Sequence, residues 1–374
     1  MGSLPSPPRR PGLARHEHLV YVSFCLRKPT PISNWIECYH PSNNSWSHVS
    51  LIPGVPERQV LKGFAMVSLQ DSVYIIGGRR CYKEMAHVSD ELAELIDVEI
   101  EVVSTVMRYD VRTGSWSECA QLGTPRSDFA CTVHGNRIYV AGGQSAPSSA
   151  RGVSSAEVYD PNLDVWAPLP DMGTLRYKCA GVTWNDRIYV VGGFVEKLDS
   201  PASPYTIERS SAEVFDPETG RWEMLANMWR LDIPPNQIVS LGGRLFSSGD
   251  CLKSWKGQIE AYDPKLQMWT DVRGSHLHRL SCPTTTNTSN NVGNSSRAWA
   301  SSQQLYLTMA PIESHLYFLA GYRGAEEGEA PRTASMVHVF DMSGNSPTWR
   351  SMEPAEEEGE KQLCAHCCVV RLLA

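Results

Sequence analysis

Short apolar runs, each four to six residues long, recur along the chain and are separated by turn-forming residues. FACTV (129–133) and IYVAGG (138–143) flank a connection that contains Gly135 and Asn136. These two residue types adopt positive φ at low cost, so such a connection predicts a tight β-hairpin. A third run, SAEVYDP (155–161), ends at Asp-Pro, which stops a strand, and a fourth, DVWAPL (164–169), follows directly. The pattern predicts a unit of four antiparallel strands, named a to d in chain order.

This unit repeats. The aromatic residue of strand c and the tryptophan of strand d are seven residues apart in five copies and nine apart in a sixth: Tyr39/Trp46, Tyr109/Trp116, Tyr159/Trp166, Phe215/Trp222, Tyr262/Trp269 and Phe340/Trp349. Strand b ends in a double glycine at Gly78, Gly143 and Gly193, with degenerate copies ending at Asp250 and Gly321. A single small sheet cannot bury both of its faces, so several are expected to stack radially as a β-propeller.

The double glycine, the tyrosine and the tryptophan in this order resemble the Kelch repeat, over about residues 17–373. The predicted fold is all-β: a six-bladed Kelch β-propeller with four-stranded antiparallel blades. The first blade lacks a strand a before HLVYVSFCL (18–26), whereas LCAHCCVVRLL (363–373) is a lone strand a after the last tryptophan. We therefore expect the C-terminal strand to complete the N-terminal blade and close the ring.

The domain prediction is a disordered leader at residues 1–16 and a single propeller at 17–373, with insertions at 79–104 and 272–304. The second insertion is polar and of low complexity, which predicts disorder. In the first, Ser89 is expected to cap a short helix with Leu92, Leu95 and Ile96 on one side, followed by an early start of strand c. This segment would cover the channel mouth, or it is a solvent-exposed loop.

Composition narrows the choice of partner. The net charge of −7 argues against nucleic acid, and no apolar run approaches the roughly 18 residues of a membrane span. Gly2 and Ser6 fit the loose N-myristoylation pattern, and the alternative is an unmodified Pro/Arg-rich leader. Eleven cysteines without a secretory signal predict reduced thiols in the cytoplasm or nucleus. For CAHCC (364–368), packing of a crowded inner strand is favoured over a metal site.

In an up-and-down blade the b–c and d–a links emerge on the same face, and these are the long, dissimilar links of the chain. Function concentrates on such loops, so this face is the predicted binding site. Arg126 and Arg176 each precede the first glycine of their repeat by sixteen residues. The candidate partner-binding residues are Arg79, Arg126, Gln144, Arg176, Tyr177, Phe194, Tyr205, Arg230, Trp255, Tyr322 and Arg323.

Arginine forks suit carboxylates and phosphates, and arginine and aromatic residues dominate binding hot spots. The predicted partner is therefore a protein or peptide, acidic or phosphorylated. The alternative is that the arginines pair with carboxylates of neighbouring blades and hold the blades together.

No catalytic motif of the G-x-S-x-G, Walker or H-E-x-x-H type occurs, so no enzyme activity and no cofactor are expected. The repeats are similar to the Kelch part of plant F-box/Kelch proteins, although no F-box is recognisable in the 17 or so residues before the first strand. The resemblance implies a protein-interaction module, a scaffold or a substrate-recognition component of a ubiquitin-ligase pathway. The alternative is a metal-dependent propeller enzyme resembling galactose oxidase or the specifier proteins.

Overall fold

The computed structural model describes residues 16–89, 92–149, 151–196, 210–229, 233–252, 255, 257–272, 303–324, 332–344 and 346–373. Every regular element in these residues is a β-strand. Residues 1–15 of the predicted leader, almost all of the 272–304 insertion, Tyr205 and Arg230 lie outside the described residues, whereas His16 begins the first strand.

Six antiparallel sheets, each built around four strands, form the blades. Blade 1 contains β30 (Lys361–Leu373), β1 (His16–Leu26), β2 (Trp35–His40) and β3 (Ser45–Leu51). Blade 2 contains β5 (Ala65–Leu69), β6 (Ser72–Ile76), β9 (Val106–Asp110) and β10 (Ser115–Glu118). Blade 3 contains β11 (Ala130–His134), β12 (Arg137–Ala141), β13 (Ala156–Asp160) and β14 (Val165–Leu169).

Blade 4 contains β16 (Ala180–Trp184), β17 (Arg187–Val191), β19 (Ala212–Asp216) and β20 (Arg221–Leu225). Blade 5 contains β21 (Ile238–Leu241), β22 (Arg244–Ser247), β23 (Glu260–Asp263) and β24 (Met268–Asp271). Blade 6 contains β25 (Gln303–Ile312), β26 (His315–Arg323), β27 (Thr333–Asp341) and β28 (Thr348–Ser351), and β29 (Ala355–Glu357) also pairs with β27. The predicted six-bladed Kelch-type propeller is confirmed.

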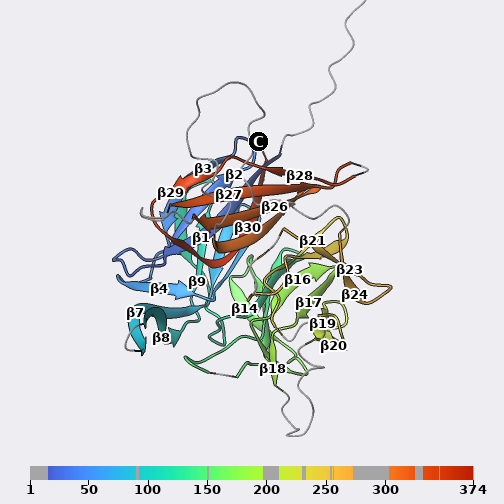
Figure 1. Cartoon of the computed structure of the whole chain (residues 1–374). Helices are drawn as coiled ribbons and strands as arrows, with labels where there is room; N and C mark the ends of the chain where they lie inside the picture. Colours follow the sequence, from blue (N-terminus) through green and yellow to red (C-terminus); the bar gives the residue numbers. More distant parts are fainter. Residues whose placement is uncertain are drawn as a thin grey trace, which may run out of the picture.

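The two ends of the described chain close the ring. β30 pairs antiparallel with β1 from His16↔Leu373 to Leu26↔Lys361, and Figure 1 shows the blue and red ends of the colour scale together in one sheet. The innermost strands contact one another in the cyclic order β5, β11, β16, β21, β25, β30 and back to β5. The predicted completion of the N-terminal blade by the C-terminal strand is therefore confirmed.

The repeated aromatic pairs are direct cross-strand neighbours in strands c and d, as in Tyr159↔Trp166. In all six pairs the ring centroids are 5.0 to 5.5 Å apart. Several tryptophans also reach the preceding blade: the indole of Trp166 donates to the Ala120 carbonyl (2.9 Å), and that of Trp222 to the Pro170 carbonyl (2.8 Å). The spacing of seven thus serves both cohesion within a blade and attachment between blades.

This attachment predicts a difference between two matched substitutions. Trp166→Phe removes a donor from the Ala120 carbonyl, whereas Trp349→Phe removes an indole N–H that has no hydrogen-bond partner among the described residues. We expect Trp166→Phe to destabilise the protein by about 1–2 kcal/mol more than Trp349→Phe, since both lose similar ring area but one leaves an acceptor unsatisfied. Urea unfolding of the two variants measures this difference. Equal losses would contradict a role of the indole N–H in joining the blades.

The 79–104 insertion is a β-hairpin, so the predicted helix after Ser89 is wrong. β7 (Arg79–Ser89) pairs with β8 (Leu92–Val102), and β4 (Gln59–Lys62) adds a third strand, all grouped outside blade 2 in Figure 1. Ile96, Val98 and Ile100 alternate along β8, a period of two that overrides the helical spacing once β7 supplies a partner strand.

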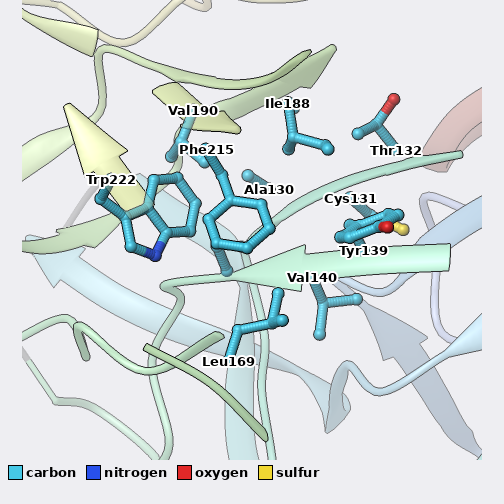
Figure 2. A pocket seen from close by; sticks show the side chains of 12 residues that line it. Ala130, Cys131, Thr132, Tyr139, Val140, Leu169, Ile188, Val190, Phe215 and Trp222 are labelled. Atoms are coloured by element: carbon cyan, nitrogen blue, oxygen red, sulfur yellow. The ribbon is translucent and has the colours of Figure 1, made fainter. Parts of the chain in front are cut away.

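A second small sheet lies beside blade 4. It consists of β15 (Leu175–Tyr177) and β18 (Phe194–Glu196), with Tyr177 opposite Phe194. Between blades 3 and 4 the packing leaves a space of only about 10 Å³. Figure 2 shows the apolar side chains of Leu169, Phe215 and Trp222 around this space. A volume near that of one water among apolar groups is a packing gap between blades and not a ligand site.

Candidate functional site

The six innermost strands enclose a central channel of about 840 Å³. Each strand contributes lining residues, among them Val67, Thr132, Val182, Ser240, Pro311 and Ala365. At one end the lining passes to residues of the b–c and d–a links, and this end is called the channel mouth below. It is lined by Lys62, Arg79, Asp97, Asp128, Lys178, Asn236, Cys251 and Gln362.

Most charges at the mouth are neutralised within the chain. Arg79 pairs with Asp128 and, at 2.9 Å, with Glu99 of the hairpin. Lys62 pairs with Asp97. Lys178 is exposed and has no ion-pair partner in the part of the chain that the structure describes. Among the mouth residues that the structure describes, Lys178 therefore offers an unpaired ammonium group to a ligand.

Lys178 and the equivalent residues of the two preceding blades have a left-handed backbone conformation. Gly63, Asp128 and Lys178 each stand two residues before the innermost strand of blades 2, 3 and 4, with φ of 62°, 53° and 53°. The Asp128 N–H donates to the Gly63 carbonyl (2.7 Å), and the Lys178 N–H donates to the Asp128 carbonyl (2.6 Å). A left-handed conformation costs a non-glycine residue about 1–2 kcal/mol. Such strain is typical of functional positions, and here it fixes Asp128 and Lys178 side by side.

Arg126 and Arg176 have no exposed surface, so the prediction that they contact a partner is wrong. Arg126 pairs with Glu157 at 2.7 Å and donates to the Gly142 carbonyl (2.9 Å) and the Ser155 carbonyl (2.8 Å). Arg176 repeats the arrangement one blade later with Glu213, Gly192 and Ser211 as partners: its Nε lies 3.4 Å from Glu213 Oε1 and its guanidinium donates to the Gly192 carbonyl (3.1 Å).

The double glycine explains why each arginine precedes the first glycine of its repeat by sixteen residues. The Gly142 carbonyl accepts from the Arg126 side chain, while the Gly143 N–H donates to the Arg176 backbone carbonyl of the next blade (2.7 Å). The Gly78 N–H donates to the Arg126 carbonyl in the same way (2.7 Å). Each arginine therefore ties two blades: its backbone bonds to the preceding blade and its side chain to its own. The arginines thus hold blades together, as the alternative to partner binding predicted. The carboxylate partner, however, belongs to the arginine's own blade and not to a neighbouring one.

Two further candidates are core residues, and their predicted contact with a partner is also wrong. Trp255 is 5% exposed, stacks on Phe318 with 4.7 Å between ring centroids, and donates from Nε1 to the Gln258 carbonyl. Tyr322 is 3% exposed, and its hydroxyl lies 3.3 Å from His338 Nε2. Burial lowers the pKa of His338 to about 4, so this histidine is neutral at physiological pH.

The other candidates lie at the surface of the link face. Tyr177 and Phe194 are half-buried, with ring centroids 5.1 Å apart, and Tyr177 directly precedes Lys178 in the chain. Gln144 is half-buried and donates to the Ser149 carbonyl. Arg323 is 40% exposed and pairs with Glu360 at 2.9 Å. Of the predicted set, Arg79 alone is among the described residues that line the mouth with Lys178, and it is paired.

The sequence reasoning missed Lys62, Asp97, Asp128 and Lys178. A signal for two of them exists: when RSDFACTV (126–133) is aligned with RYKCAGVT (176–183), Asp128 and Lys178 occupy the same position of the repeat. The predicted packing role of CAHCC is confirmed for Cys364 and Cys368, which belong to the core cluster between blades 1 and 2, and for Cys367, which packs toward blade 6.

Residues 125–173 and 175–228, which are blades 3 and 4 with their leading links, match the Kelch motif. The chain contains Kelch motifs. It is 32% identical to an F-box/kelch-repeat protein of Arabidopsis thaliana over 34% of this chain and 30% of that protein. It is 28% identical to Kelch-like protein 40 of Mus musculus over 38% of this chain and 20% of that protein. A Kelch repeat and BTB domain-containing protein of Horsepox virus is also 28% identical, over 30% of this chain and 19% of that protein.

The matches therefore span less than a third of each of these Kelch-repeat relatives. They agree with the propeller and with a protein-interaction module. Among the described residues, no helix has the length and apolar character that crossing a bilayer requires.

Proposed function

We propose that this Kelch propeller is a non-catalytic module that binds a peptide or protein partner at the channel mouth, on the face of the b–c and d–a links. The observation that supports this most directly is the exposed Lys178, which a strained backbone holds at the mouth. An unpaired cation at the rim of the channel suits a segment that carries an acidic or phosphorylated side chain.

The partner's cellular role is inferred from the relatives. They are named for F-box or BTB domains joined to Kelch repeats. We propose that the propeller supplies substrate recognition or scaffolding in a ubiquitin-ligase pathway, in the cytoplasm or nucleus. In this role the propeller contributes recognition only, since the rigid ring positions its loops and performs no chemistry of its own.

A selection from a phage-displayed library of random peptides tests the site without a partner having to be chosen. Peptides retained by the wild-type protein are expected to share an Asp, Glu or, after phosphorylation, phosphoserine position. Their affinity should fall at least about tenfold in Lys178→Glu, which replaces attraction by repulsion at one contact.

Lys265→Glu is the matched control, because Lys265 is exposed on a c–d turn at the opposite end of blade 5. This variant makes the same change in net charge and is expected to retain full affinity. Selected peptides that bind both variants equally would place the binding surface away from the mouth and contradict the proposal.

A further inference from the structure

Two buried thiols meet where the ring closes. Cys25 lies on β1 opposite Gln362 of β30, and Cys364 stands two residues further along β30, so the two cysteines are diagonal neighbours across the closing strand pair. In the strand register Phe24 is opposite Leu363 and Ser23 is opposite Ala365, so that Cys364 is the extra residue of a β-bulge. Both thiols belong to the core cluster between blades 1 and 2.

Positive charge converges on this pair from the neighbouring small sheet. The ammonium groups of Lys62 and Lys83 both donate to Gln362 Oε1, at 2.8 and 2.9 Å, and the Cys25 Sγ lies 4.0 Å from the same oxygen. The charged and titratable groups that act on Cys25 are Cys364 on β30, Lys62 on β4, Lys83 on β7 and Asp97 on β8. Two cations and one anion thus surround the two thiols.

We propose that Cys25 and Cys364 form an oxidisable dithiol that a peroxide converts into a disulfide, joining the first strand of the ring covalently to the last.

The surroundings give the two sulfurs different roles. The hydrogen bond from Cys364 and the charges of Lys62 and Lys83 outweigh burial and Asp97, and they lower the pKa of Cys25 from 9.0 to about 7. Burial, chiefly, raises the pKa of Cys364 well above 9.0. At neutral pH a substantial fraction of Cys25 is therefore thiolate, the nucleophilic form, beside a protonated thiol that can resolve an oxidised intermediate.

The channel gives a small oxidant access. Cys364, Gln362, Lys62 and Asp97 are among the residues that line the channel, and Cys25, next to Cys364 across the strand pair, has no exposed surface. Hydrogen peroxide is of the size of a few water molecules and fits this route. Larger disulfides such as oxidised glutathione do not reach a fully buried sulfur, which restricts the reaction to small oxidants.

The chemistry proceeds in two balanced steps. The Cys25 thiolate attacks one peroxide oxygen, the S–O bond forms, the O–O bond breaks, and hydroxide leaves. The Cys364 thiol then gives its proton to this hydroxide, which becomes the first water, and attacks the Cys25 sulfur. The S–S bond forms, the S–O bond breaks, and a second hydroxide leaves, which takes up the proton that Cys25 released on ionisation and becomes the second water. Overall, two thiols are oxidised to a disulfide and one hydrogen peroxide is reduced to two waters.

The consequence is a locked ring. A bond between residues 25 and 364 closes a loop of nearly the whole chain, and long loops give the largest entropic stabilisation in the chain-entropy description. Oxidation also removes the thiolate that Lys62 and Lys83 face, so the charge balance at the channel mouth changes with the redox state.

The test exposes the purified, folded protein to hydrogen peroxide at pH 7 and maps its peptides without reduction. A linked peptide containing Cys25 and Cys364, lost on treatment with dithiothreitol, is expected together with an upward shift in Tm. Cys251, which is exposed, reports that oxidant was sufficient. Free Cys25 and Cys364 in samples whose Cys251 is fully oxidised would overturn the proposal.

Variants separate the roles of the sulfurs. Cys364→Ser should give no linked peptide and no rise in Tm, with Cys25 advancing to sulfenic and sulfinic acid. Cys38→Ser is the matched control, because Cys38 is a buried thiol of the same core cluster whose pKa burial raises to about 12, and it should leave disulfide formation intact. A linked peptide that involves Cys38 instead would contradict the assignment.

Lys83→Met keeps both thiols and tests the activation, so the proposal stays falsifiable if a cysteine variant fails to fold. Loss of one cation should raise the pKa of Cys25, which moves the midpoint of the rate-versus-pH curve upward from about 7 and slows oxidation at pH 7. At pH 7, a rise of this pKa by about one unit would lower the thiolate fraction from about one half to about one tenth. An unchanged pH profile would show that the lysines do not activate Cys25 and would overturn this step.

Discussion

Deletion of residues 361–374 is expected to abolish cooperative folding of the entire propeller, although it removes a single strand. β30 pairs with β1 along its whole length and packs against the innermost strands of blades 2 and 6. Val370 is fully buried, the Cys367 N–H donates to Thr308 Oγ1 (2.9 Å), and Ser68 donates to the Val369 carbonyl (2.6 Å). The strand therefore belongs to blade 1 and also packs against blades 2 and 6.

The magnitudes support a global effect. Burying a residue such as Val370 contributes about 1.5–3 kcal/mol, and each backbone hydrogen bond of a strand pair contributes about 1 kcal/mol net. Lost over the length of β30, these contributions are comparable with the about 5–15 kcal/mol that separates a folded domain from its unfolded state. The deletion also leaves the edge of β1 unpaired, which favours aggregation.

Calorimetry of the truncated protein measures this effect as the loss of a single cooperative unfolding transition. A shorter deletion of Leu373 and Ala374 is the control, since Leu373 is 62% exposed at the end of the strand, and it should shift Tm little. A protein without residues 361–374 that unfolds in one transition at the wild-type Tm would show that the ring does not depend on its closing strand.

The fold was predictable because the sequence repeats the same four-stranded unit, with its aromatic pair, six times. In each blade the aromatic residue of strand c lies directly opposite the tryptophan of strand d, so the degenerate pair Phe340 and Trp349 could be recognised from the complete ones. The unmatched strands at the two ends indicated the closure. The 79–104 insertion occurs once and has no copy to compare with. Its helical and strand patterns overlap, and the pairing of β7 with β8 decides between them.

The site was less predictable because burial of a side chain depends on distant strands. Arg126 is buried because Glu157, 31 residues later, supplies a carboxylate, and nothing in the local sequence distinguishes it from an exposed arginine. Trp255 belongs to a link between strands, yet the ring of Phe318 from blade 6 covers it. Lys178 was not predicted because exposure at the channel mouth follows from the backbone bend before the innermost strand, which the repeat register hints at but does not define.

Arg126→Ala is expected to lower the free energy of unfolding by about 3–5 kcal/mol, the range for breaking a buried ion pair from one side. The substitution leaves the Glu157 carboxylate with only the backbone N–H groups of Gly123 (2.7 Å) and Thr124 (3.2 Å), and it removes the donor that the Gly142 carbonyl accepts from. Both costs arise from unpaired polar groups in a site that water does not reach.

Arg137→Ala is the matched control in the same blade. Arg137 pairs with Asp160 at 2.9 Å, but its side chain is 53% exposed, so the loss should not exceed about 1 kcal/mol. Urea unfolding of both variants measures the contrast, and equal losses would show that the buried side-chain bonds of Arg126 stabilise the protein no more than an exposed ion pair does.

The combined variant Arg126→Met/Glu157→Leu separates the cost of the unpaired Glu157 carboxylate from the cost of the lost hydrogen bonds to backbone carbonyls. Removing both partners abolishes the uncompensated carboxylate, so it should regain part of the stability that Arg126→Ala loses. It should not regain all of it, because no donor returns to the Gly142 and Ser155 carbonyls. Stability equal to that of the wild type would show that these carbonyl bonds contribute nothing, and that Arg126 is present in the repeat only to neutralise Glu157.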